Sequence, residues 1–177
     1  MNTKKLEQNL IDLVKEQQAK LGYRKESVQL FYPLSSLQHI LECHCDITKI
    51  LYHLNQISDM FTDTLGHITI THSGEQFCFH IPPEGSEWVH QHISDTEFIV
   101  QLVELVGRHG CTMDKIFHLF EKQDNPVHTE QVSHGEFDYL IYFESGEDNY
   151  YYCFKKEGEH MIYHRFLPED YADFNFN

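Results

Sequence analysis

Long apolar runs are missing from this chain of 177 residues. No stretch approaches the ~18 consecutive apolar residues that a membrane-spanning helix needs, so we expect no membrane partner. The first ten residues become polar at once and contain no apolar segment of the kind found in signal peptides. These two absences predict a protein located in the cytoplasm.

Positive charge is also scarce. The chain has 13 Lys and Arg against 28 Asp and Glu, a formal net charge of −15. No Lys or Arg occurs in the 58 residues from Ile50 to Gly107, whereas residues 1–25 carry a net +3. Nucleic acid is bound mainly by neutralising its phosphates, so we expect no nucleic-acid partner. The net −18 of residues 26–177 instead favours basic partners, although it equally suits a protein kept soluble by its charge.

Recognised chemical motifs are absent as well. We find no phosphate-binding loop, no dinucleotide fingerprint and no Gly-x-Ser-x-Gly elbow. The five cysteines are odd in number and include no Cys-x-x-Cys pair, which predicts reduced thiols rather than a disulfide framework. A helix predicted from Thr112 carries too little basic charge to act as the recognition helix of a helix-turn-helix.

Linkers and repeats are absent too. The 9 Gly and 5 Pro residues fall singly or in pairs between predicted elements. A composition of 41% hydrophobic and 14% aromatic residues is too apolar for a disordered chain. The sequence therefore predicts a single domain over residues 1–177.

Hydrophobic periodicity predicts an α+β fold with helices first. The first helix begins near Thr3 and ends at Gly22. Apolar residues at helical spacing place the other helices at Ser35 to Cys43, Asp46 to Gly66, around Trp88, Asp95 to Gly110, and from Thr112 onward.

Alternation predicts two β regions, a small hairpin and a C-terminal three-stranded antiparallel sheet. A turn at Ser73-Gly74 would place Ile70 opposite Phe77 and His67 opposite His80. In the C-terminal sheet, turns at Gly146-Glu147 and Glu157-Gly158 would place Tyr139 opposite Phe154, and Phe154 opposite Met161.

The C-terminal sheet has apolar residues on both faces. Tyr142 and Tyr151 are directly opposed on the second face, with Leu140 and Cys153 nearby. A sheet of this kind needs cover on both sides. Its own helices or a partner chain could supply that cover.

Two groups of His and Cys could hold a metal ion. His67, Cys78 and His80 share the polar face of the predicted hairpin, where opposed positions lie about 5 Å apart. The alternative is a solvated face in a chain with 14 histidines.

The second group is His39, Cys43 and Cys45. His39 and Cys43 stand four residues apart, hence on one face of the predicted helix, and Cys45 could join from its end. Neither group has the spacing of a known zinc site, so chance proximity is the competing interpretation.

A reactive thiol is a third hypothesis. Cys111 lies at a predicted helix start, where the helix dipole lowers a thiol pKa, and His109 is two residues upstream. No orienting group or oxyanion site can be identified, so a structural thiol is favoured over a catalytic one. The sequence leaves the question of an enzyme open and leans towards a non-enzymatic protein.

Three segments resemble one uncharacterised bacterial family, a domain of unknown function. They are EQQAKLGYRKE at Glu16 to Glu26, LFYPLSSL at Leu30 to Leu37, and GEFDYLIYF at Gly135 to Phe143. The resemblance spans nearly the whole chain and implies a bacterial, single-domain, cytosolic protein. It implies no site residues.

The leading hypothesis is a non-enzymatic acidic interaction domain that binds a protein partner or associates with itself. The alternative is a metal-binding protein or metal-dependent enzyme that uses one of the two His/Cys groups. Sub-stoichiometric transition metal in protein purified without a histidine tag would remove this alternative.

Overall fold

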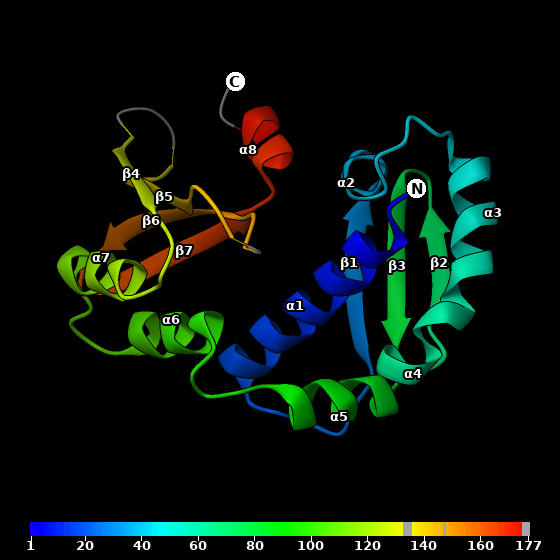
Figure 1. Cartoon of the computed structure of the whole chain (residues 1–177), viewed down its shortest axis with the longest axis horizontal. Coiled ribbons are helices and arrows are strands. Elements are labelled where there is room, and N and C mark those ends of the chain that lie inside the picture. The colour runs from blue at the N-terminus through cyan, green and yellow to red at the C-terminus, as the bar shows by residue number, and fades with distance from the viewer. Residues whose placement is uncertain (133–135, 147, 175–177) are drawn as a thin grey trace. The chain divides into compact units, whose positions relative to one another are not determined.

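The structure, a computed structural model, describes residues 1–132, 136–146 and 148–174 (Figure 1). The chain divides into two compact units, Met1–Asp95 and Thr96–Asn177. Each unit combines helices with its own antiparallel sheet, which confirms the α+β class. The predicted single domain requires the two units to unfold together in one cooperative transition.

The N-terminal unit surrounds a three-stranded sheet in the order β1-β3-β2. Its elements, in chain order, are α1 (Thr3–Leu21), β1 (Val28–Pro33), α2 (Leu34–Ile40), α3 (Ile47–Ile57), η1 (Ser58–Phe61), α4 (Thr62–Leu65), β2 (Thr69–Ser73), β3 (Gln76–Ile81) and α5 (Pro83–His92).

Helix α1 forms as its apolar spacing predicts. Leu6, Leu10 and Val14 are fully buried on one face. The N-cap is Asn2, whose side chain accepts a hydrogen bond from the Lys5 amide at 3.1 Å. The helix ends at Gly22, whose φ of 76° suits glycine.

The predicted hairpin register is wrong by two residues. The turn is Gly74-Glu75, so Ile70 pairs with Phe79 and Thr69, not His67, pairs with His80. A two-residue turn with positive φ only at its first position needs glycine there, and Gly74 has φ 57°. A two-residue shift leaves each side chain on its predicted face. Strand β1 joins β3 along its other edge, a long-range pairing that enlarges the hairpin to a sheet.

The C-terminal unit contains a four-stranded sheet in the order β4-β5-β6-β7. Its elements are α6 (Phe98–Gly107), α7 (Met113–Glu121), β4 (Val127–Gln131), β5 (Tyr139–Phe143), β6 (Tyr151–Glu157), β7 (His160–Phe166) and α8 (Pro168–Phe174).

The predicted sheet of three strands is corrected to four. Strand β4 is polar and mostly exposed, so alternation did not mark it. Tyr139 pairs with Phe154 as predicted, although Glu147 of the first predicted turn lies outside the described residues. The second turn is Gly158-Glu159, so Phe154 pairs with Tyr163 instead of Met161. Glycine again occupies the first turn position, with φ 62°.

Aromatic rings form the core of the C-terminal unit. Phe120 of α7 is fully buried and contacts Phe143, Tyr152 and Phe154, with ring centroids 5.1, 5.4 and 6.2 Å away. Phe98 of α6 approaches the same cluster at 4.7 Å from Phe120. Helices α6 and α7 therefore cover one face of this sheet. No helix within the described residues is long and apolar enough to cross a membrane.

A buried thiol should make the fold sensitive to alkali. Cys153 is fully buried, and this raises the pKa of its thiol from 9.0 to about 12. Between these two values the unfolded chain loses the proton while the folded chain keeps it, so the free energy of unfolding falls as pH rises above about 9. Each pH unit in that window lowers the free energy of unfolding by up to about 1.4 kcal/mol.

Urea unfolding at pH 8 and at pH 10.5 measures this slope. The Cys153→Ala variant should lose part of the slope, while its difference from wild type at pH 8 reports only the cavity that the substitution leaves. An unchanged slope in the variant would show that Cys153 does not contribute.

Candidate functional site

The first predicted metal group is only partly assembled. The Sγ of Cys78 and the Oγ1 of Thr71 each lie 3.4 Å from the Nε2 of His80. His67 precedes β2, and its Nδ1 lies 3.8 Å from an Asp59 carboxylate oxygen. Burial raises the pKa of the Cys78 thiol, with a hydrogen bond from Thr71 acting in the opposite direction. The site therefore offers one Cys–His pair.

The second predicted metal group, His39, Cys43 and Cys45, does not share one helical face. Helix α2 stops at Ile40, so Cys43 is not on the helical face that holds His39. A loop brings Cys43 beside Cys45 instead, pinned by a hydrogen bond of 2.8 Å from Gln38 Nε2 to the Cys45 carbonyl. Burial is the largest cause that raises the pKa of the Cys43 thiol. Among the described residues, no group of three or more His, Cys, Asp or Glu could hold a metal ion.

The Cys111 thiol has the environment of a structural cysteine. It is 2% exposed, and burial raises its pKa despite the opposing charge of Lys115. His109 forms an ion pair with Glu159 when protonated. Since a nucleophilic cysteine needs a lowered pKa, this thiol lacks the activation that the hypothesis requires.

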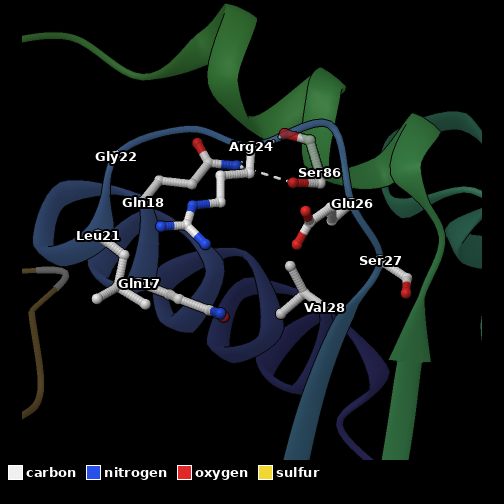
Figure 2. Close-up of a pocket in the computed structure, with 9 residues that line it drawn as sticks. All are labelled: Gln17, Gln18, Leu21, Gly22, Arg24, Glu26, Ser27, Val28 and Ser86. Carbon is white, nitrogen blue, oxygen red and sulfur yellow. Dashed lines mark hydrogen bonds between the residues drawn. The ribbon is translucent and has the colours of Figure 1, made fainter.

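A small cavity lies beside the C-terminal end of α1 (Figure 2). Gln18 Nε2 donates to the carbonyl oxygen of Ser86 at 2.8 Å and lies 3.2 Å from its hydroxyl, which joins α1 to α5. Gln18 Oε1 is buried and has no hydrogen-bond partner among the described residues. The cavity volume of about 100 Å³ is smaller than the ~150 Å³ of a cavity that accommodates benzene. Its size suits ordered water better than an organic ligand.

A buried polar network braces the C-terminal sheet. The Tyr152 hydroxyl donates to Asp148 Oδ2 at 2.6 Å, and the Tyr150 amide donates to Asp148 Oδ1 at 3.0 Å. Burial raises the pKa of both Asp148 and Tyr152. The Arg165 guanidinium lies 4.0 Å from the centre of the Tyr150 ring. Since these groups are enclosed by the sheet's own residues, their role is structural.

The second face of the C-terminal sheet carries a row of aromatic residues. His128, Tyr142, Tyr151 and Phe166 are direct partners from strand to strand, one on each of the four strands. The His128 and Tyr142 rings stack with centroids 4.6 Å apart, and Tyr142 and Tyr151 stack at 4.4 Å. This pairing confirms that Tyr142 and Tyr151 oppose each other on the second face.

Helix α8 covers one end of this row. The Tyr171 ring lies 5.4 Å from Tyr151 and 6.3 Å from Phe166, between β6 and β7. The other end, on β4 and β5, is half-exposed: the side chain of His128 is 39% exposed. Of the two alternatives for cover, the protein's own helices therefore supply it over part of this face.

Two carboxylates border the half-exposed end. Glu130 Oε2 lies 3.8 Å from His128 Nε2, and Glu144 Oε1 lies 3.9 Å from His128 Nδ1. Their side chains are 61% and 56% exposed. Partial burial raises the pKa of Tyr142, and Tyr151 and then these two carboxylates add to the effect. We call His128, Tyr142, Tyr151, Glu130 and Glu144 the acidic aromatic patch.

The comparisons with known proteins identify a family. The sequence model of DUF3877, a domain of unknown function described from E. rectale, matches residues 3–175. The chain belongs to the DUF3877 family. This membership confirms the resemblance to a bacterial family that the three sequence segments indicated. No curated protein and no solved structure matched the chain.

The sequence pattern predicted two of the five residues of the acidic aromatic patch. Alternation marked Tyr142 and Tyr151 on the second face, but His128 and Glu130 lie on β4, which alternation missed. A signal was present, because His128 and Glu130 are two residues apart with Thr129 between them, a spacing that puts both on one face of a strand. Only one apolar residue, Val127, supports that strand.

Proposed function

We propose that this protein is a non-enzymatic interaction domain that binds an extended, arginine-bearing segment of a protein partner at the acidic aromatic patch. The observation that carries the proposal is the position of two exposed carboxylates on either side of one half-exposed ring. Glu130 and Glu144 each approach a different nitrogen of His128, so they bracket the ring.

Charge favours a basic ligand. Both carboxylates are more than half exposed, so an arriving cation can reach them without breaking a buried pair. The rest of the protein adds to their attraction, because residues 26–177 carry −18. Such a field raises the rate of encounter with basic partners and disfavours acidic ones.

Ring geometry favours arginine over lysine. One face of the His128 ring stacks on Tyr142, and β4 is the edge strand, so the other face points away from the sheet. A planar guanidinium stacks on such a face and donates to carboxylates on both sides. A lysine ammonium would reach one carboxylate as a point charge.

The edge of β4 supplies backbone contacts for an extended ligand. An edge strand presents N–H and C=O groups that its own sheet leaves unpaired. A peptide that adds as a further strand would pair with these groups and place alternate side chains on the face of the patch. At the opposite edge of the sheet, both α6 and α8 pack on β7.

The test is titration of the full chain with a ten-residue peptide that alternates Arg and Thr. A peptide with Gln in place of each Arg is the ligand control. The Glu130→Gln/Glu144→Gln double variant should bind the Arg peptide at least about tenfold more weakly, because charge-assisted hydrogen bonds contribute about 1.5–3 kcal/mol each.

Glu26→Gln/Glu75→Gln is the matched control, since both carboxylates are exposed and the change in net charge is the same. This variant should stay within about twofold of wild type. Equal weakening in the two variants would mean that net charge alone attracts the peptide. Equal binding of the Arg and Gln peptides would also contradict the proposal. If the protein forms an oligomer in solution, and Glu130→Gln/Glu144→Gln weakens its self-association, the patch binds a second copy of the chain instead.

A further inference from the structure

We propose a second binding site, a cavity between α6 and α7 that takes a small organic anion, a phosphate ester or a carboxylate. Its volume is about 230 Å³. Four of its lining residues are basic and two are leucines: Arg108, Lys115, His118, Lys122, Leu105 and Leu119.

The charge of this lining runs against the charge of its surroundings. Residues 96–177 contain six Lys and Arg and 16 Asp and Glu. Three of those six cations, Arg108, Lys115 and Lys122, line this one cavity, and Glu104 is the one carboxylate among the described lining residues. Cations that lie close together repel one another, and an anion bound between them would relieve that repulsion.

Helical spacing places the basic side chains of α7 along the cavity. Lys115, His118 and Lys122 stand at i, i+3 and i+7, one face of α7 and its C-cap. Arg108 follows the last turn of α6, on the other side of the cavity. The anion would therefore meet positive charge from both helices.

The cations keep donors available for a ligand. Arg108 Nη2 lies 3.4 Å from Glu104 Oε2, which leaves the other N–H groups of the guanidinium. Lys115 Nζ donates to the Gly110 carbonyl at 3.2 Å, which orients the ammonium and leaves two of its hydrogens. In the described part of the chain, the Lys122 ammonium forms no ion pair.

The volume of the cavity and the negative charge around it favour a small anion over a nucleic acid. The open pocket of about 230 Å³ has more room than the ~150 Å³ enclosed cavity that accommodates benzene, so an anionic group with a compact organic body would fit. Leu105 and Leu119 supply the apolar contact for that body. A polyanion would extend beyond the cavity into an acidic surface, where repulsion grows with each added phosphate.

The experiment titrates the full chain with phenyl phosphate, benzoate, inorganic phosphate and a 20-nucleotide DNA strand. Resonances of α6 and α7 followed by NMR report where each binds. Phenyl phosphate should saturate the site, and Arg108→Gln/Lys122→Gln should weaken it at least about tenfold. Lys155→Gln/Lys156→Gln on β6 is the control with the same charge change, and we expect less than about a twofold effect there.

The ligand arms separate the sources of the anion. Tighter binding of phenyl phosphate than benzoate assigns a phosphate ester, the reverse order assigns a carboxylate, and either supports the site. No saturation by any small anion, equal weakening in both double variants, or tighter binding of DNA would overturn it. The Glu130→Gln/Glu144→Gln variant should bind these anions as wild type does, so failure here is distinct from failure of peptide binding.

Discussion

Replacing Phe120 by alanine should lower the free energy of unfolding of the C-terminal unit by about 3–5 kcal/mol. The side chain is fully buried and its ring touches Phe98, Phe143, Tyr152 and Phe154. Truncation removes these contacts and leaves a cavity between α7 and the sheet that the surrounding rings can fill only in part. Because domains are stable by only about 5–15 kcal/mol, the loss is a large share of the total.

Urea unfolding followed by far-ultraviolet circular dichroism measures this loss. Phe117→Ala is the matched control on the same helix, since Phe117 is half-buried and has a ring contact with Tyr139 at 5.6 Å. It should cost less than half as much. Equal costs at the two positions would mean that Phe120 is not central to the packing.

Replacing Gly85 by alanine should destabilise the N-terminal unit by about 3 kcal/mol or more. A Cβ at this position would overlap the carbonyl oxygen of Leu65, at the end of α4, and lie 2.5 Å from its carbon. It would also lie 2.8 Å from the Ile81 side chain. Because the obstacle is backbone, α5 and α4 would have to separate to admit one methyl group.

Gly107→Ala is the control for this second prediction. Gly107 ends α6, and a Cβ there meets no heavy atom within 4 Å. The control should therefore be neutral or slightly stabilising, because alanine loses less conformational freedom than glycine on folding. A cost for Gly85→Ala as small as that of the control would refute the close approach of α4 and α5.

The Phe120→Ala variant also tests the predicted single domain. Trp88, the one tryptophan, lies in α5, so its fluorescence reports on the N-terminal unit. If the chain unfolds as one domain, Phe120→Ala shifts the fluorescence transition as much as the circular dichroism transition. Independent units would leave the fluorescence midpoint unchanged.

Local patterns in the sequence predicted the elements better than their pairing. Apolar spacing located α1 and α3, and α3 begins at the predicted place, where Asp46 caps it by accepting from the Lys49 amide at 2.8 Å. Of the three predicted hairpin registers, that of β5 with β6 is right. The other two are wrong by two residues, because hydrophobic alternation repeats every two residues and cannot distinguish such neighbours. The position of glycine in the turn carried the missing information.

Long-range pairing was beyond the sequence patterns. The union of β1 with β3 joins segments about 50 residues apart, and no local pattern specifies it. Strand β4 and helix α8 are short and polar, so neither has the apolar period by which an element is recognised. The acidic aromatic patch as a whole therefore could not be predicted from the sequence, because it forms only through the pairing of β4 with β5, which sets His128 opposite Tyr142.

The register error in the first hairpin also changes the predicted metal group of His67, Cys78 and His80. A turn one residue earlier would have set His67 opposite His80, beside Cys78. The observed turn puts Thr69 there and leaves His67 near Asp59. A three-ligand site is therefore reduced to a pair by the choice of turn residues alone, without any change in which face each side chain occupies.

The most direct test of the central claim is amide hydrogen exchange across the C-terminal sheet, with and without saturating Arg-Thr peptide. If the peptide adds to the edge beside Glu130 and Glu144, exchange at amides of β4 should slow by about tenfold or more, while β7 is unchanged. Saturation of the protein with no change in β4, or slowing confined to β7, would contradict the account.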